Sequence, residues 1–302
     1  TLLVAFIRAP FIQAPVAGAT LRFAAGVFSA WVLVLSSSWC LVELSREGTS
    51  QFGAWMYTGV GIGITLAGAL AWLGGLQAAW VLWLELGLLA AIGTAFVIRT
   101  MPRANAGAAL ARAPERSDAP AGYADLVICY GTFGFGYIVP ATFLPALARE
   151  QVSNPLVFGL TWPVFGIAAA VSVAVVARSL SSSPRRRVWG AAQAFMAIGT
   201  GLPALTQSLW SLTLSAVLVG GTMMVTTMAG LQLARELTPA NPTPLLARMT
   251  SAFAAGQIAG PVLVRVFPVQ SAGGWSGMTF ASAVAALLLA ATAAWLWRSA
   301  RA

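Results

Sequence analysis

The chain has 302 residues, of which 59% are hydrophobic and only 8% are charged. Soluble domains carry about three times that share of charged residues, so a water-soluble fold is excluded. The formal charge is +9, and every basic residue is an arginine. The arginines stand singly or in short groups between hydrophobic runs, which is typical of membrane-protein loops and not of the clustered basic face of a nucleic-acid-binding protein.

Apolar runs of about 20 residues, each long enough to cross roughly 30 Å of hydrocarbon as an α-helix, recur along the chain. After a hydrophobic stub at Thr1–Ala9, they predict nine complete transmembrane helices, at Thr20–Leu44, Phe52–Gly75, Ala78–Ile98, Tyr123–Ala148, Leu156–Ala177, Val188–Gln207, Leu209–Leu233, Leu245–Phe267 and Trp275–Trp297. We therefore expect an all-α integral membrane protein folded as a helical bundle.

Arginine placement also predicts the orientation of the helices, because cytoplasmic loops are enriched in basic residues. Arg46, the triplet Arg185–Arg187 and Arg298 fall on alternate connections, whereas the connections around Leu76 and Gln207 carry almost no charge. The prediction is a multi-pass protein of the bacterial inner membrane, with its central loop and C-terminus in the cytoplasm.

The longest connection, residues 99–122, is rich in alanine, proline, arginine and acidic residues, a composition typical of a flexible linker. It separates residues 1–98, with three predicted spans, from residues 123–302, with six. Many transporters consist of two six-helix halves joined by one cytoplasmic loop. We therefore expect three further spans at the N-terminus of the whole protein, with the stub Thr1–Ala9 as the end of the third.

The residue types exclude several kinds of chemistry. Without histidine the chain lacks the usual general base and the commonest metal ligand. Without lysine it cannot form the GxxxxGK[ST] loop that holds the phosphates of ATP. We therefore expect that the protein is not an enzyme and binds neither a metal ion nor a cofactor. Any energy for its function must come from an ion gradient or from a partner protein.

Two charged residues inside the predicted spans are candidates for function. Arg22 lies near one end of its span, where it either reaches the headgroups or holds an anionic substrate in a cavity. Glu85 lies about seven residues into Ala78–Ile98 and is the only acidic residue well inside any span. Because the membrane interior penalises charge, Glu85 is the candidate for proton coupling, with a structural hydrogen-bonding role as the alternative.

The span Tyr123–Ala148 has the most unusual composition. Gly134 and Gly136 precede Pro140 and Pro145, and each proline frees the carbonyl four residues earlier. We expect a kinked helix, which either lines a cavity or only packs against its neighbours.

The aromatic residues of this span predict a strip on one helical face. Tyr130, Phe133 and Tyr137 are spaced at i, i+3 and i+7. This strip either contacts substrate or packs between helices. Met223 and Thr226 of Leu209–Leu233 belong to a soft, weakly polar patch that suits either an apolar cavity or the core.

Small residues recur at every fourth position in two spans, where they let helix backbones approach closely. They are Gly59, Gly63 and Ala67 in one span, and Ala252, Gly256 and Gly260 in the other. Pro261 frees the carbonyl of Gln257, whose side-chain amide is placed to cross-link helices.

Three motifs resemble the major facilitator superfamily (MFS). Arg22-Phe-Ala-Ala-Gly26 looks like the RxxxG signature of its fourth helix, and Gly256-Gln257-Ile-Ala-Gly260-Pro261 is similar to its glycine–proline seam motif. The stretch from Gly131 to Pro145 is similar to the seventh helix of the uncharacterised YbfB/YjiJ-type branch. The resemblance covers essentially the whole chain, as helices 4–12 of a twelve-helix transporter, N-terminally truncated and without the loop motif between helices two and three.

The resemblance implies an alternating-access permease, with a cavity lined by helices one, four, seven and ten. We expect a secondary active transporter, proton-coupled and exporting small organic or amphiphilic compounds, that is a monomer when full length. Its expected partners are the lipid bilayer and a small-molecule substrate, with no nucleic acid. The alternatives are an intramembrane enzyme acting on lipid and a non-transporting receptor on a transporter fold.

Overall fold

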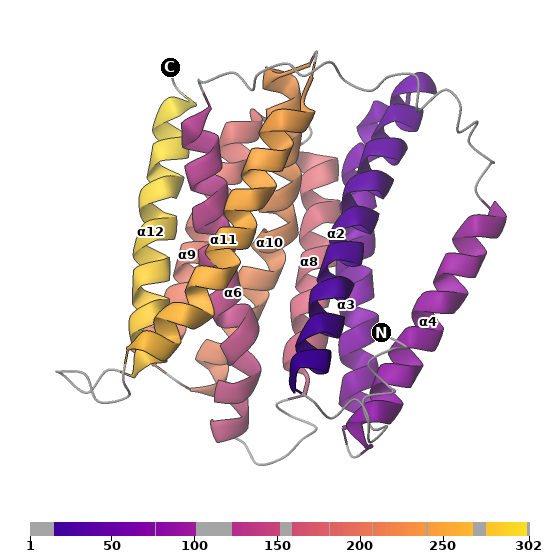
Figure 1. Ribbon diagram of the computed structural model, residues 1–302. Helices are drawn as coiled ribbons and strands as arrows, with labels where there is room; N and C mark the ends of the chain where they lie inside the picture. Colours follow the sequence, from indigo (N-terminus) through magenta and orange to yellow (C-terminus); the bar gives the residue numbers. More distant parts are fainter. Residues whose placement is uncertain are drawn as a thin grey trace. The chain divides into compact units, whose positions relative to one another are not determined.

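A computed structural model describes residues 15–75, 77–100, 123–151, 159–180, 182–206, 208–239, 241–267 and 276–300, and every regular element in these ranges is a helix (Figure 1). The elements in chain order are α2 (Pro15–Arg46), the 3₁₀ helix η2 (Ser50–Tyr57), α3 (Thr58–Leu73), α4 (Ala79–Thr100), α6 (Ala124–Gln151), α8 (Thr161–Ser179), α9 (Arg185–Leu205), α10 (Leu209–Leu237), α11 (Thr243–Val266) and α12 (Gly277–Ser299). The all-α fold is confirmed.

Seven of the described helical stretches are long and apolar enough to cross a membrane. They are η2 with α3, then α4, α6, α8, α9, α10 and α12. In hydrocarbon a helix satisfies its own backbone hydrogen bonds, which is why long apolar runs fold in this way. Helices α2 and α11 also coincide with predicted spans but are not among the seven, so the prediction of nine complete crossings is not confirmed.

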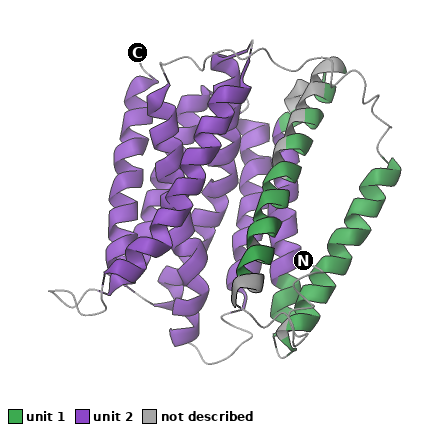
Figure 2. Ribbon diagram, in the orientation of Figure 1, with its two compact units in different colours: residues 1–53, 69–115 green, residues 54–68, 116–302 purple. Residues whose placement is uncertain are grey.

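Two compact units make up the chain (Figure 2). One comprises residues 1–53 and 69–115, and the other comprises residues 54–68 and 116–302. We call helices α6 and α8 to α12 of the second unit the C-terminal bundle. The stub Thr1–Ala9 and residues 101–122 of the predicted linker lie outside the described residues.

Several helices end at residues suited to that position. The Ser208 side chain accepts a hydrogen bond from the Ser211 amide at the start of α10, and Ser276 accepts one from the Thr279 amide at the start of α12. Such caps satisfy amides that have no partner within the helix. Gly48 follows α2 with a φ of 70°, a left-handed conformation that glycine adopts without strain.

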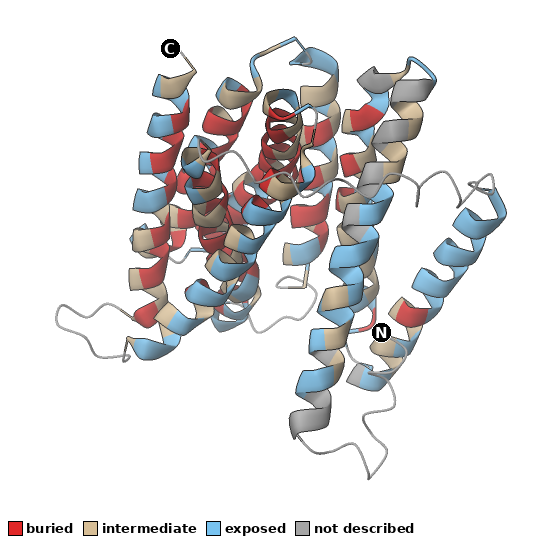
Figure 3. Ribbon diagram, turned by 45° about the horizontal axis from the view of Figure 1, so that its top comes forward, coloured by how far each residue is buried: buried red, intermediate tan, exposed pale blue. Residues whose placement is uncertain are grey.

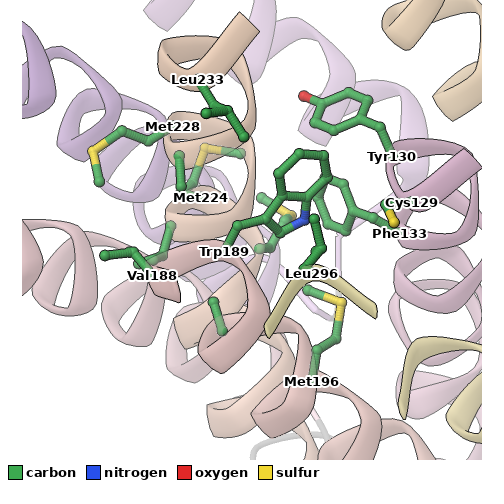
Figure 4. Packing of buried hydrophobic residues seen from close by; sticks show 14 of the residues in the cluster. Cys129, Tyr130, Phe133, Val188, Trp189, Met196, Met224, Met228, Leu233 and Leu296 are labelled. Atoms are coloured by element: carbon green, nitrogen blue, oxygen red, sulfur yellow. The ribbon is translucent and has the colours of Figure 1, made fainter. Parts of the chain in front are cut away.

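Buried residues gather in the C-terminal bundle (Figure 3). In it, α9 packs against α10 and α12, and α6 packs against α11. The largest fully buried side chains of the main core cluster include Trp189, Phe133 and Phe165. Figure 4 shows Trp189 of α9 beside Tyr130 of α6. Met196 lies about two turns further along α9.

Helix α6 continues without interruption from Ala124 to Gln151, through Pro140 and Pro145. The missing hydrogen bond at Pro140 leaves the Gly136 carbonyl without its helical donor. The Thr200 hydroxyl of α9 donates to this carbonyl at 3.3 Å. A side chain of a neighbouring helix therefore replaces the hydrogen bond that the proline removes.

The same arrangement recurs within α9. Pro203 lies inside the helix and frees the carbonyl of Gly199. The Ser215 hydroxyl of α10 donates to that carbonyl at 2.6 Å. Thr200 and Ser215 are both fully buried, so each hydrogen bond joins two helices at a depth that water does not reach.

Ion pairs join helix ends on the arginine-rich side of the C-terminal bundle. The Arg186 guanidinium at the start of α9 donates to the Asp125 carboxylate of α6 at 2.9 Å and to the Ser299 hydroxyl of α12 at 2.9 Å. Arg185 donates to Glu236, near the end of α10, at 3.3 Å. These contacts fix the same end of four helices.

Candidate functional site

The aromatic strip predicted on α6 forms a continuous row of rings. The ring centres of Tyr130 and Phe133 are 5.4 Å apart, in an edge-to-face arrangement. Those of Phe133 and Tyr137 are 6.3 Å apart. Spacings of 4.5 to 7 Å of this kind are favourable contacts between aromatic rings.

Phe253 of α11, which the sequence analysis did not single out, faces all three rings of the strip. Its ring centre lies 5.5 Å from that of Tyr130, 5.0 Å from that of Phe133 and 6.3 Å from that of Tyr137. With Tyr137 it is nearly parallel, at an interplanar angle of 19°. We call Tyr130, Phe133, Tyr137 and Phe253 the aromatic cluster.

Glycines explain how Phe253 comes to lie over the strip. A side chain at Gly134 would overlap the Phe253 carbonyl, and one at Gly256 would overlap the Gly131 carbonyl. The backbones of α6 and α11 therefore touch where they cross. This crossing holds the Phe253 ring at contact distance from the strip, and the sequence signal for it was the spacing of Gly256 and Gly260.

Other helices close the sides of the aromatic cluster. Trp189 of α9 meets Tyr130 edge-on with ring centres 5.8 Å apart, and Phe165 of α8 lies 6.3 Å from Tyr137. On α10, a side-chain carbon at Gly230 would lie 3.0 Å from the Tyr130 ring, so this glycine leaves the space that the ring fills. Residues of α8, α9 and α10 thus contact the cluster, whose own rings come from α6 and α11.

The exposure of the cluster differs along its length. Tyr130 is 4% exposed and Phe133 is fully buried, whereas Tyr137 and Phe253 are only partly buried. The first two rings therefore fill the core of the C-terminal bundle. Tyr137 and Phe253, stacked on each other, form the more exposed part of the cluster.

Met223 and Thr226 lie on α10 and are both buried. The Thr226 hydroxyl has no hydrogen-bond partner among the described residues. A buried hydroxyl without a partner is destabilising by about 1–3 kcal/mol, and a polar atom brought next to it would relieve that loss. Thr227 does not share this feature, because its hydroxyl donates to the Met223 carbonyl at 3.0 Å.

The two charged candidates belong to the unit of residues 1–53 and 69–115. The Arg22 position lies in α2, but its side chain is outside the described residues. Glu85 lies in α4, is half-buried, and makes no hydrogen bond or ion pair with another described residue. The aromatic cluster belongs to the other unit, which comprises residues 54–68 and 116–302.

The remaining candidates are residues of helix packing. A side chain at Gly136 would overlap Leu289 of α12, and one at Gly260 would overlap Ile138. Pro140 is buried and Pro145 is partly buried inside α6, and Pro261 lies inside α11. The Gln257 side chain is partly buried and makes no hydrogen bond with another residue of the described ranges.

Within the part of the chain that the structure describes, no three cysteine, aspartate or glutamate side chains are grouped so that they could hold a metal ion. Several buried polar groups instead join helices. The Trp189 indole donates to the Gln193 side chain at 2.7 Å, and Gln193 donates in turn to the Thr292 hydroxyl of α12. This network is satisfied within the bundle and supports Trp189, which contacts the aromatic cluster.

Apolar helices of membrane length, closely crossing glycines and buried interhelical hydrogen bonds together define a multi-pass helical membrane protein. A family model described as "Uncharacterised MFS-type transporter YbfB" matches residues 2–295. The chain belongs to this family of MFS-type transporters, which confirms the resemblance that its motifs predicted and points to transport rather than catalysis. Comparisons with curated proteins and with solved structures found no match.

Proposed function

We propose that this transporter is a proton-coupled, alternating-access exporter of small, flat organic or amphiphilic compounds in the bacterial inner membrane. The observation that carries the proposed substrate class is the stacked pair of Tyr137 and Phe253 at the partly open part of the aromatic cluster. Aromatic faces bind flat apolar groups and cations, with about 0.5–2 kcal/mol for each contact.

The other parts of the proposal use the charged candidates. Glu85 supplies the proton site, because its carboxylate lies within an apolar helix and has no partner among the described residues. Arg22 supplies a positive charge for an anionic group of the substrate. The arginine-rich ends of the helices and the C-terminus face the cytoplasm. Nine helices of this chain cross the membrane. The full-length protein works as a monomer.

Everted membrane vesicles with an imposed pH gradient test this proposal. Ethidium, a flat aromatic cation that tests the aromatic contacts and not the Arg22 charge, serves as the probe, and its uptake is followed by fluorescence. We expect uptake that requires the protein and stops when a protonophore collapses the gradient. Uptake that is unchanged by the protonophore would refute proton coupling.

Variants separate the aromatic cluster from the rest of the transporter. Tyr137→Ala is expected to lower the apparent affinity for ethidium about 10-fold, which corresponds to about 1.4 kcal/mol of lost stacking. Phe195→Ala, which removes an exposed aromatic ring of α9, is the matched control and should leave uptake unchanged. Equal affinities of the two variants, at equal amounts of folded protein, would contradict the proposed site.

A further inference from the structure

A hollow of about 340 Å³ opens at one end of the C-terminal bundle, remote along α6 from the aromatic cluster. It lies where α6 ends and where α8 and α10 begin. The lining residues are Ala148 of α6, Leu160, Thr161 and Val164 at the start of α8, and Leu209, Trp210, Leu212, Thr213 and Ala216 of α10.

The chemistry of this hollow is almost wholly apolar. Its floor is a small buried cluster that includes Ala148, Leu212 and Ala216. Among the described residues of the lining, Thr161 and Thr213 alone have hydroxyl groups, and the Thr213 hydroxyl already donates to the Leu209 carbonyl at 2.8 Å. None of the described lining residues is charged, so the hollow suits an uncharged, apolar group, and a charged headgroup would be unfavourable inside it.

The depth of the hollow matches the outer part of one lipid leaflet. Leu209 is the first residue of α10, and Ala216 lies seven residues further along. At about 1.5 Å per residue, the hollow reaches about 10 Å from the helix end into the hydrocarbon region. Trp210 at its rim is 85% exposed, and exposed tryptophans of membrane proteins concentrate at the level of the headgroups.

We propose that this hollow binds an acyl chain of a membrane phospholipid, with the glycerol and headgroup beside Trp210 at the rim. A convex helix surface that faces lipid contacts each acyl chain on one side only. A concave apolar surface holds one chain on several sides, so it exchanges that lipid more slowly than the rest of the protein surface does. The proposal concerns a lipid site and does not depend on the transported substrate.

Photocrosslinking tests the proposal in vesicles of phosphatidylethanolamine and phosphatidylglycerol that contain a phosphatidylcholine with a diazirine in the upper half of one acyl chain. After irradiation, peptides of the reconstituted protein are mapped by mass spectrometry. We expect crosslinks to concentrate on the lining residues of α8 and α10. An even distribution over exposed apolar residues such as Leu287 would overturn the proposal.

Neighbouring substitutions on α10 give a matched pair. Thr213→Trp fills the hollow from its rim, whereas Leu214→Trp introduces the same side chain at the next position, which is exposed but does not line the hollow. We expect Thr213→Trp to lower crosslinking of Leu160 and Val164 at least five-fold and Leu214→Trp to leave it unchanged. Equal crosslinking in both variants would contradict the site.

Other occupants give different results in the same vesicles. If residues of this chain or a second copy covered the hollow, the lining would not be labelled by the lipid at all, and a photoreactive amino acid introduced in place of Leu160 would crosslink to a peptide. Either finding would refute the lipid site. The thermal unfolding midpoint of each variant, measured beside the wild type, shows that the compared proteins are equally folded.

Discussion

Helices α4 and α9 are of similar length, yet they differ in how apolar they are and in how far they are buried. Within the part of the chain that the structure describes, α4 is the most apolar of the seven membrane-length helices and has hardly any buried residues, whereas α9 is the least apolar and is more than half buried. In a soluble protein the order would be reversed, because water selects polar residues for exposed faces. In a membrane, lipid selects apolar residues for the exposed faces, and the protein interior accommodates the polar ones.

The polar residues of α9 show why the interior needs them. Lipid and leucine are equally apolar, so burial alone does little to hold two helices together in a membrane. Gln193 and Thr200 of α9 instead hydrogen-bond to α12 and α6. Gly199 allows close contact with Leu218 and Val219 of α10. Shape and hydrogen bonding therefore specify this bundle, and the following substitutions test that conclusion.

The largest effect is expected for Gly134→Leu, because a side chain there overlaps the backbone of α11. Separating α6 from α11 should destabilise the protein by about 3 kcal/mol or more. Gly93→Leu on α4 is the control, since no atom of the described residues lies within 4 Å of a side-chain carbon at that position. The measurement is the thermal unfolding midpoint of each purified protein in detergent. A similar shift for both variants would contradict the conclusion that close helix packing stabilises the C-terminal bundle.

A smaller effect is expected for Gln193→Leu. This change leaves the Trp189 indole without its acceptor in the core and should destabilise the bundle by about 2 kcal/mol. Thr94→Val on α4 serves as the control, because the exposed Thr94 hydroxyl only donates to the Ala90 carbonyl of its own helix. The control should stay within about 0.5 kcal/mol of the wild type, and a larger loss there than in Gln193→Leu would contradict the conclusion.

Sequence and structure agree best where one physical constraint dominates. The helices could be predicted because lipid requires apolar residues over a fixed length, and Gly256 could be singled out because small residues repeat with the helix period. Phe253 could not, since nothing local shows which partner an aromatic residue faces. The hydrogen bond of Thr200 to Gly136 joins residues 64 positions apart, and only the three-dimensional packing reveals it.

Ser215→Ala is expected to destabilise the protein by about 1 kcal/mol, because the Gly199 carbonyl loses its donor. In a Pro203→Ala background the alanine amide can donate to that carbonyl, so the same Ser215→Ala change should have little effect. A double-mutant cycle of unfolding midpoints measures this difference. Thr222→Val is the control, because the Thr222 hydroxyl bonds only within its own helix. Equal effects of Ser215→Ala in both backgrounds would show that the proline and the serine are independent.

The smallest effects are expected at the helix ends. Arg186→Gln removes contacts to Asp125 and Ser299. It should destabilise the protein by about 0.5 kcal/mol, because solvent reaches both charged side chains and weakens their attraction. Arg185→Gln should have no measurable effect, since Glu236 is 55% exposed on its side chain. Unfolding at low and high salt checks the assignment, and the Arg186 effect should shrink as salt is added.

Thr200 donates to the carbonyl that Pro140 frees, and Ser215 to the one that Pro203 frees. This pairing limits the order in which the proline and the hydroxyl can arise by mutation. A threonine that arrives first is tolerated, because its hydroxyl can bond a carbonyl of its own helix, as Thr292 does with Leu288. A proline that arrives first buries a carbonyl with no donor and is selected against. With Thr200 in place, Pro140 is acceptable, because the freed Gly136 carbonyl has a donor; with Pro140 in place, losing Thr200 alone leaves that carbonyl without one. Related chains are therefore expected to contain the hydroxyl without the proline far more often than the proline without the hydroxyl.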